Sequence, residues 1–411
     1  MVSTAAPRME SSASSFLFDR AEMAGALGDL GVLVPIAVAL IVKNGLTPTA
    51  VLLPAGLLYV VAGLVYRLPV PVQPLKAFGA IAIAHGFGSD DIAAGAILMG
   101  IIFVALGASG LLDRVAKVFP HPIIRGIQLS VGLLFCQLAW KLVAATPKAF
   151  TDHRHSIWWL GGATTVVIAA ALLLRRRQIT LLLVVLAGVA VALTYRGSVS
   201  FGPSALHHPH LSLAAFSAAA VALVLPQLPL SFANSCLATA DAARTYFGDA
   251  ARRVRPGRLA ITFGLANLVA GGISGMPVCH GAGGMTAHRS FGARSGGAPI
   301  MLGGVLIALA LAVGASLATA LSGFPVPILA GLLTVAGIMH IALLKDLQGP
   351  AQWALALVVG ITGFLSNLAI ALLGALLIWW AARWVRAWKA RRNGDGATPR
   401  PPTNSEPGQP N

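Results

Sequence analysis

Residues that could hold an anion gather at two places in an otherwise apolar chain. Each place follows a long apolar run that is broken by the same dipeptide, at Pro69-Val70 and again at Pro277-Val278. The ten residues around each break, 61–70 and 269–278, read as versions of one another. Helix-breaking residues at corresponding points of two halves indicate the binding site of a membrane carrier.

The candidate binding residues come directly after these breaks. A helix N-terminus carries unpaired N–H groups and about half a positive charge, which suits a compact anion. Small residues there let a tetrahedral oxyanion approach the backbone closely. The alternative is that Gly281–Gly284 only packs helices together. The residues nearest the two expected helix ends are Gln73, Lys76, Ala77 and Phe78 in the first copy, and Cys279, His280, Gly281, Ala282 and Gly283 in the second.

Further polar residues lie inside apolar runs, where each needs a partner or a function. Asp29 and Lys76 have two interpretations that stay open: Lys76 adds charge to the anion site while Asp29 carries a proton, or the two form a fixed ion pair. Gln227, Asn234 and Ser235 offer amide and hydroxyl groups that could replace water around an oxyanion. For Asn234 we favour a role in the anion site, whereas Ser235 could equally form a hydrogen bond between two helices.

A metal site is a poor interpretation of the Cys279-His280 pair. Two adjacent ligands are far short of the four that a closed zinc site needs. The cluster of His207, His208 and His210 is best explained as a solvated loop. We therefore expect no metal and no cofactor.

Composition indicates a polytopic membrane protein. The chain has 411 residues, of which 57% are hydrophobic and 10% charged, with a mean hydropathy of +0.81. Apolar runs long enough to cross a bilayer recur along it, and the three cysteines imply no disulfide framework. We predict an all-α fold of about 14 transmembrane segments, arranged as a 7+7 inverted repeat with two half-helices at the membrane midplane.

The expected spans divide into two sets of seven. Those at 76–87 and 281–289 are too short to cross a ~30 Å core and are the predicted half-helices. The others lie near 21–42, 48–66, 91–112, 122–145, 157–174, 179–196, 213–243, 258–274, 297–320, 324–343, 350–364 and 366–386. The expected organisation is a disordered N-terminus at 1–15, a first repeat at 16–196, a second repeat at 213–388 and a disordered tail at 391–411.

The basic residues predict the orientation in the membrane. With both termini cytoplasmic, most of them fall in cytoplasmic loops, such as those at 114–125, 175–177 and 252–258. The net charge of +16 then reflects topology and contact with anionic lipids. Nucleic-acid binding does not fit, because these residues are scattered over several short loops.

Four motifs carry a resemblance to a known family: Gly25–Gly31, Pro69–Ala77, Leu225–Leu230 with Asn234-Ser235, and Met276–Gly284 followed by Phe291–Arg294. They resemble the molybdate transporter type 1 family of the SulP sulfate-transporter superfamily. The resemblance implies a substrate-binding domain from about 21–112 and 213–320, a gate or scaffold domain from about 122–196 and 324–386, and no C-terminal cytoplasmic regulatory domain. Val32–Pro35 departs from the family pattern, in which a bulkier aromatic residue is expected near this point. This departure leaves the identity of the substrate open.

The expected function is secondary active uptake of molybdate across the plasma (inner) membrane by an elevator-like movement. No phosphate-cradling loop is present, so direct ATP drive is not indicated. A dianion that enters against a negative-inside potential costs ~2.3 kcal/mol per charge per 100 mV, which favours proton coupling, with Asp29 as candidate carrier. The partners expected are a small oxyanion (molybdate, sulfate or tungstate) and lipids, with the choice between monomer and homodimer open. Alternatives are a sulfate transporter, a nucleobase-type carrier, which would want a carboxylate near Asn234 or His280, and a membrane enzyme, for which no catalytic cluster is found.

Overall fold

The fold is almost entirely helical. The structure is a computed structural model that describes residues 16–27, 30–112, 114, 118–173 and 178–392. In the first half the helices are α1 (Arg20–Ala26), α2 (Leu30–Val42), α3 (Pro48–Tyr66), α4 (Lys76–His85), α5 (Ser89–Ser109), α7 (His121–Ala144), η2 (Thr151–Arg154), α8 (Ile157–Leu173) and α9 (Gln178–Thr194). In the second half they are α10 (Leu213–Ala219), η3 (Ala220–Val224), α11 (Leu225–Leu230), η4 (Ser231–Ala238), α12 (Thr239–Phe247), η5 (Gly248–Arg253), α13 (Pro256–Gly272), α14 (Ala282–Ser290), α15 (Gly297–Ala312), α16 (Gly314–Leu321), α17 (Val326–Ile341), η6 (Ala342–Asp346), α18 (Gly349–Thr362), η7 (Gly363–Asn367) and α19 (Leu368–Arg392).

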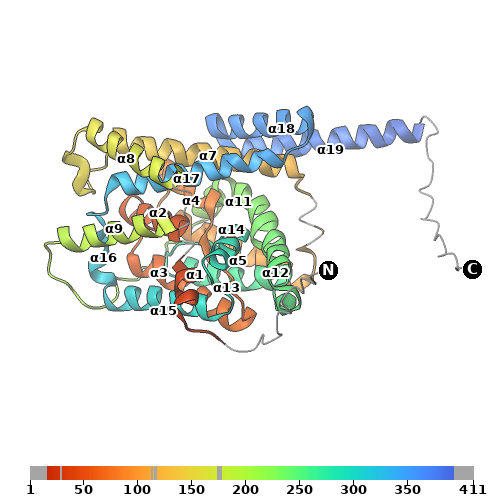
Figure 1. Ribbon diagram of the computed structural model, residues 1–411. Helices are drawn as coiled ribbons and strands as arrows, with labels where there is room; N and C mark the ends of the chain where they lie inside the picture. The colour runs from red at the N-terminus through yellow and green to blue at the C-terminus, as the bar shows by residue number, and fades with distance from the viewer. Residues whose placement is uncertain (1–15, 28–29, 113, 115–117, 174–177, 393–411) are drawn as a thin grey trace, which may run out of the picture.

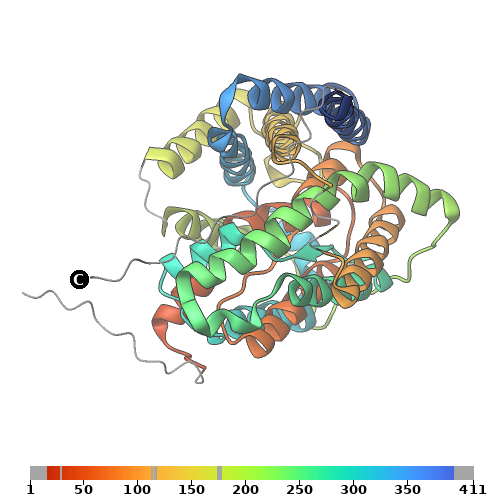
Figure 2. The same ribbon diagram turned by 90° about the vertical axis from the view of Figure 1, so that its right-hand side faces the viewer.

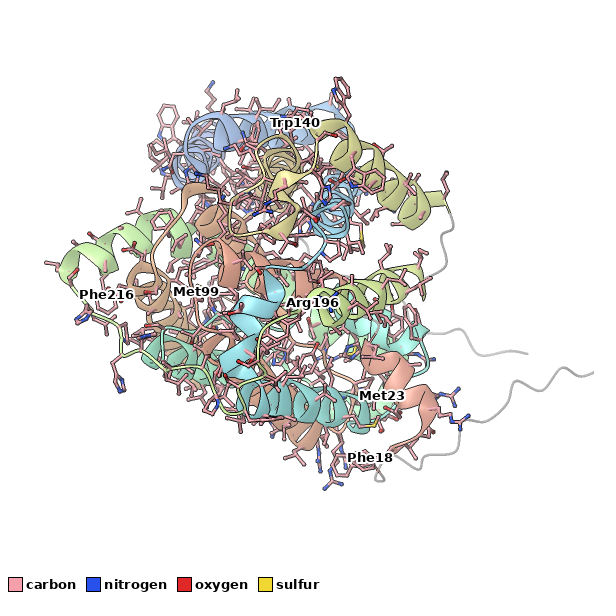
Figure 3. All side chains as sticks on the ribbon, turned by 90° about the vertical axis from the view of Figure 1, so that its left-hand side faces the viewer. Phe18, Met23, Met99, Trp140, Arg196 and Phe216 are labelled. Atoms are coloured by element: carbon pink, nitrogen blue, oxygen red, sulfur yellow. The ribbon has the colours of Figure 1, made fainter. Side chains whose placement is uncertain are left out.

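The helices and their outer surface are those of an integral membrane protein. By length and composition, six helices among the described residues could cross a membrane, or eight if each bent pair is one span. Large apolar side chains cover the outside: Trp140 is 64% exposed and lies at the edge of the molecule (Figure 3). A soluble protein rarely exposes so much contiguous apolar surface. The predicted fold class, an all-α polytopic membrane protein, is confirmed.

Two predicted half-helices are present close to their predicted bounds. The expected spans 76–87 and 281–289 correspond to α4 and α14, which have 10 and 9 residues. A non-helical segment, the crossing segment, precedes each of them: residues 67–75 before α4 and 273–281 before α14. Both segments contain proline, which fixes φ and removes a backbone donor. In both crossings a non-glycine residue with left-handed φ follows the preceding helix: Arg67 at 55° and Ser274 at 52°. The two crossings therefore leave the full-length helices in the same way.

The two crossings meet in the only sheet among the described residues. Strand β1 (Gln73–Pro74) pairs antiparallel with β2 (Val278–Cys279), so that Gln73 lies opposite Cys279. The two chain directions are opposed at this point, and each strand leads into its half-helix. The match between Pro69 and Pro277 does not extend into these helices: Lys76 comes seven residues after Pro69, whereas Ala282 comes five after Pro277.

Where a helix of the first half packs on a helix of the second half, the counterparts of these two helices also pack on each other. α5 packs on α13, and their counterparts α15 and α3 pack on each other; likewise α7 packs on α18 while α17 packs on α8. In the α5–α13 and α3–α15 contacts, each helix contributes two glycines that are seven residues apart in the sequence. On α3 and α15, Gly56 approaches Gly303 and Gly63 approaches Gly296; on α5 and α13, Gly100 approaches Gly264 and Gly107 approaches Gly257. Small residues let membrane helices approach closely, and their repetition here is the expected consequence of an inverted repeat.

The helices pack in two groups. α7, α8, α17, α18 and α19 lie together at one side of the molecule, and α3, α5, α13 and α15 lie at the other (Figure 1). At the boundary, α4 packs on α7 and α2 packs on α17. The predicted ends 1–15 lie outside the described residues, as does most of the tail from 391.

Several predicted spans differ from the structure, among them those at 350–364 and 366–386, which η7 joins into one helical run. The span at 213–243 is a long helical run (Figure 2). Within it η3 and η4 are π-helical turns, and Pro226 and Pro229, which lack the N–H donor, lie between them. The span at 297–320 bends by 92° between α15 and α16. The last span extends past 386, because α19 continues to Arg392.

Candidate functional site

The N-termini of the two half-helices lie beside the β1–β2 pair. In α4 the amides of Lys76, Ala77 and Phe78 precede the first intrahelical hydrogen bond, which Gly79 N makes to Leu75 O at 2.7 Å. In α14 the amides of residues 282–284 precede the bond from Met285 N to Gly281 O at 3.1 Å. Neither helix has a side chain of its N-cap residue as a hydrogen-bond acceptor. Two sets of backbone donors, one from each half-helix, therefore lie beside the same antiparallel strand pair.

Three of the predicted site residues meet at the start of α14. A Cβ on Gly281 would lie 2.3 Å from Gln73 Oε1 and 3.3 Å from Asn234 Nδ2. The side chains of the first crossing and of η4 thus lie directly against the Gly281 backbone, which only glycine permits. Gln73 is 1% exposed and Asn234 is half-buried. The structure brings these three candidate residues together from three distant segments.

Gln227 caps α4. Its Oε1 accepts the Phe78 amide at 3.1 Å, and its Nε2 donates to Ser231 Oγ at 3.0 Å. Both side chains are buried. Gln227 therefore uses one of the three amides at the start of α4 and leaves those of Lys76 and Ala77.

Asn234 and Ser235 lie on the π-helix η4. A π-helical turn inserts an extra residue and is frequent at functional sites. Thr239 Oγ1 donates to Asn234 O at 2.8 Å, and this bond satisfies a carbonyl that the wide turn leaves over. Ser235 is 1% exposed.

Cys279 and His280 are directed into the protein. His280 is fully buried; its Nδ1 lies 2.8 Å from Pro71 O, and its Nε2 lies 2.9 Å from Thr262 Oγ1. The Cys279 thiol faces Pro74 O at 3.9 Å. Both ring nitrogens of His280 are thus engaged, so a contact between this residue and an anion would involve its backbone.

Small residues complete the α14 end. Ala282 is half-buried, and Gly283 is exposed. A Cβ on Gly283 would have no atom within 4 Å, so the space beside this residue is open. Gly281 and Gly283 therefore have different surroundings despite their spacing of two residues.

Lys76 is the cation nearest the two helix ends. Its side chain is half-buried at the first position of α4, and its charge acts on His340 of α17, across the boundary between the two helix groups. Asp29, its predicted partner, lies outside the described residues.

Comparison with known sequences identifies the family. A family model described as "Molybdate transporter of MFS superfamily" matches residues 21–135 and 219–339. The chain is 32% identical to Molybdate transporter 1 of Arabidopsis thaliana over 410 residues, which cover 89% of this chain and 88% of that protein. It is 29% identical to Molybdate transporter 1 of Chlamydomonas reinhardtii, with 89% and 94% covered. The chain belongs to the molybdate transporter family.

Solved structures show that this family member has the fold of SLC26-type transporters. The transmembrane domain of a cyanobacterium bicarbonate transporter, BicA, matches with a TM-score of 0.62 at 14% identity and covers 86% of this chain and 97% of that one. Murine Slc26a9, an anion transporter in its inward-facing state, matches with a TM-score of 0.65 at 14% identity, over 89% and 68%. The predicted resemblance and fold class are both confirmed.

Two functional candidates escaped sequence reasoning. Asn267 of α13 is fully buried, and its side-chain amide pairs with the Val278 backbone in both directions: Nδ2 donates to Val278 O at 2.8 Å, and Oδ1 accepts from Val278 N at 2.7 Å. His288, in the last turn of α14, lies 3.1 Å through Nδ1 from Pro69 O. The signal that could have found both is the presence of a polar residue inside an apolar or half-helical span.

The C-terminus of α4 is capped from the loop after α2. Lys43 Nζ donates to Ile83 O at 2.6 Å, and Asn44 Nδ2 donates to Ala82 O at 3.0 Å. Burial lowers the pKa of the Lys43 amine, and the nearby charge of Lys141 lowers it further. An amine at this end complements the negative pole of α4, whose positive pole faces the site.

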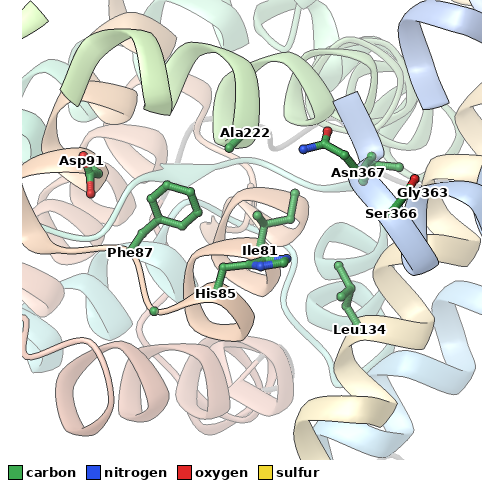
Figure 4. Close-up of a pocket in the computed structure, with 11 residues that line it drawn as sticks. Ile81, His85, Phe87, Asp91, Leu134, Ala222, Gly363, Ser366 and Asn367 are labelled. Atoms are coloured by element: carbon green, nitrogen blue, oxygen red, sulfur yellow. The ribbon is translucent and has the colours of Figure 1, made fainter. Parts of the chain in front are cut away.

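A cavity lies at this same end of α4. It has a volume of about 280 Å³, and Figure 4 shows His85 and Ile81 of α4 facing Asn367 and Ser366 of η7 across it. Asp91 of α5 lies at its far side. The cavity therefore runs between the two helix groups, and none of the predicted binding residues lines it.

Proposed function

We propose that this member of the molybdate transporter family is a secondary active transporter that takes up molybdate. It lies in the plasma membrane with both termini in the cytoplasm, an orientation supported by the position of its basic loops. The substrate class is supported by the family and by a site built for a compact anion. Its named relatives are transporters.

The observation that carries the proposal is the meeting of two opposed half-helix N-termini. Their unpaired amides are those of Lys76 and Ala77 on α4 and of residues 282–284 on α14. Two helix ends supply about one unit of positive charge, and the Lys76 ammonium adds another. This sum of about two matches a dianion, and backbone donors fit a tetrahedral shell of oxygens.

The side chains beside these amides complete the proposed site. Asn234 and Gln73 lie against Gly281, so their amide groups are within reach of an anion bound at the α14 end. Gln227 holds the first turn of α4 in place through Phe78. His280 and Asn267 fix the two crossing segments from behind. We assign binding to the first set and positioning to the second.

Transport would follow from movement of one helix group against the other. In the proposed elevator, α1–α5 and α10–α16 carry the site, and α7–α9 with α17–α19 form the gate. Both half-helices belong to the first group, and their β1–β2 pair keeps the site in one piece during movement. The contacts that must slide include those of α4 and α11 on α7 and those of α2 on α17 and α9.

Uptake by purified protein in liposomes tests the proposal. Radiolabelled molybdate should accumulate under an inward proton gradient without ATP, and excess tungstate should compete. Sulfate competition at equal concentration would indicate a general oxyanion carrier of the same fold. Absence of molybdate uptake, with uptake of sulfate alone, would overturn the substrate assignment.

A further inference from the structure

One buried histidine has a ring nitrogen that the fold does not use. His288 is 0% exposed, and its Nδ1 lies 3.1 Å from the carbonyl oxygen of Pro69. A carbonyl can only accept, so Nδ1 carries the hydrogen and donates it. In the neutral ring Nε2 then has a bare lone pair. Within the part of the chain that the structure describes, this buried atom has no hydrogen-bond partner.

His280 provides an internal comparison. It holds the same crossing segment through the same ring atom, with Nδ1 at 2.8 Å from Pro71 O. Its Nε2, however, is paired with Thr262 Oγ1 at 2.9 Å. If His288 served only to hold the proline segment, a paired Nε2 would be expected here too, because an unsatisfied buried polar atom is unfavourable. The difference between the two histidines therefore indicates a second role for His288.

Among the residues that the structure describes, His288 has no ion-pair partner. The imidazole ring of His288 stacks on the ring of Tyr59, with 6.3 Å between the ring centroids and an interplanar angle of 20°. Glu22 accepts the amides of Arg294, Ser295 and Ala298, and Tyr246 is paired with Thr286, so both have other partners. The titratable or charged groups on the elements around α14 are Arg20 and Glu22 on α1, Tyr59 on α3, Arg67 on the first crossing, Cys236 on η4, Asp241, Arg244 and Tyr246 on α12, Arg289 on α14 and Arg294 after it.

We infer that Nε2 of His288 binds the proton that accompanies the oxyanion. The lone pair of Nε2 accepts a proton from the side of uptake, while the Nδ1–H bond to Pro69 is kept, and the same proton leaves to the cytoplasm after the anion. This inference rests on the proposed transport function. It places the coupling proton on the half-helix itself rather than on Asp29.

The position of His288 explains why proton and anion would bind together. His288 comes six residues after Ala282, so it lies about 9 Å along α14 from the anion end. A cation in the last turn is favoured by the negative pole of the helix. The bound dianion then raises the proton affinity of the imidazole, and by reciprocity the proton raises the affinity for the dianion by the same factor.

The test uses His288→Asn with His340→Asn as matched control, because His340 of α17 is also buried, contacts the Ala336 carbonyl through Nδ1 and lies outside the half-helices. The asparagine amide nitrogen can take the place of Nδ1 and keep the bond to the proline carbonyl, but it has no titratable nitrogen. Molybdate binding to purified protein is measured from pH 8 to pH 6, together with molybdate self-exchange and proton-driven accumulation in liposomes. The wild type and His340→Asn should bind about fivefold or more tightly at the lower pH.

His288→Asn should bind molybdate with little pH dependence, retain self-exchange and lose proton-driven accumulation. If His288→Asn shows the wild-type pH dependence, or if Asp29→Asn alone removes it, the inference is wrong. If the wild type neither binds nor exchanges molybdate, the proposed function fails instead. Should His288→Asn not fold, ¹⁵N-imidazole NMR of the wild type decides: Nε2 of His288 must shift toward the protonated form when molybdate is added, and an unchanged signal refutes the proton site.

Discussion

Replacing Gly283 by valine should weaken molybdate binding without disturbing the protein. A Cβ at this position meets no atom within 4 Å, so the new side chain occupies only the open space beside the α14 end. Glycine is also about 1 kcal/mol less favourable than alanine inside a helix, so Gly283→Ala and Gly283→Val should not lower the stability of α14. Any loss of affinity then reports the space that the anion needs.

The magnitude follows from the hydrogen bonds that the anion would lose. A hydrogen bond to a charged group contributes about 1.5–3 kcal/mol. Displacing the anion from a single amide of residues 282–284 should therefore raise its Kd by about 10- to 150-fold. Gly283→Ala, with one methyl group, should give a smaller loss in the same direction.

Equilibrium binding of radiolabelled molybdate to purified protein measures this effect, and thermal unfolding in detergent checks the fold. Gly304→Val is the matched control, because Gly304 is an exposed helical glycine on α15 with equally open surroundings. Gly281→Ala should behave differently: its Cβ would lie 2.3 Å from Gln73 Oε1, so both stability and binding should fall. A folded Gly283→Val protein with wild-type affinity would refute the placement of the anion at this helix end.

Three further substitutions test the remaining parts of the site. Lys76→Met should raise the molybdate Kd at least about tenfold by removing a full charge; recovery in the double variant with Asp29→Asn would instead show that the two residues only pair. Asn234→Ala should reduce uptake partially, since loss of one neutral donor costs about 1–3 kcal/mol, and complete loss of uptake in a folded protein would contradict this. Asn267→Ala leaves the buried N–H and C=O of Val278 unpaired, so the unfolding free energy should fall by about 2–6 kcal/mol; unchanged thermal stability would show that the pairing is not needed.

The half-helices could be predicted because their boundaries are set locally. Prolines at 69, 71 and 74 follow one another so closely that no helical turn fits between them, and α4 begins at Lys76 as predicted. In the second copy Pro277 and Gly281 act in the same way, and α14 begins one residue after the predicted start. The spans at 76–87 and 281–289 could be recognised as too short to cross the membrane from their length alone. These features need no knowledge of the tertiary structure.

The partners of the polar residues could not be predicted, because they depend on contacts between distant segments. His280 looks like an anion ligand in the sequence, yet its ring bonds to Pro71 and Thr262. Gln227 looks like a substrate donor, yet its carbonyl oxygen caps α4. The 92° bend between α15 and α16 was likewise missed, since the apolar run continues across it. Residue type indicates that a polar group needs a partner, but not which one it finds.

The short β1–β2 pair also has a consequence for biosynthesis. Pro74 and Cys279 are separated by 205 positions in the chain, so the first crossing segment enters the bilayer long before its partner is synthesised. Until then the backbone groups of β1 lack their ladder partners, and unpaired groups are unfavourable in hydrocarbon. The ribosome must therefore release the chain as far as Cys279, well into the second half, before the first half-helix can settle. Insertion of this protein should pass through a long-lived intermediate in which α4 is still exposed to proteases or to the insertion machinery.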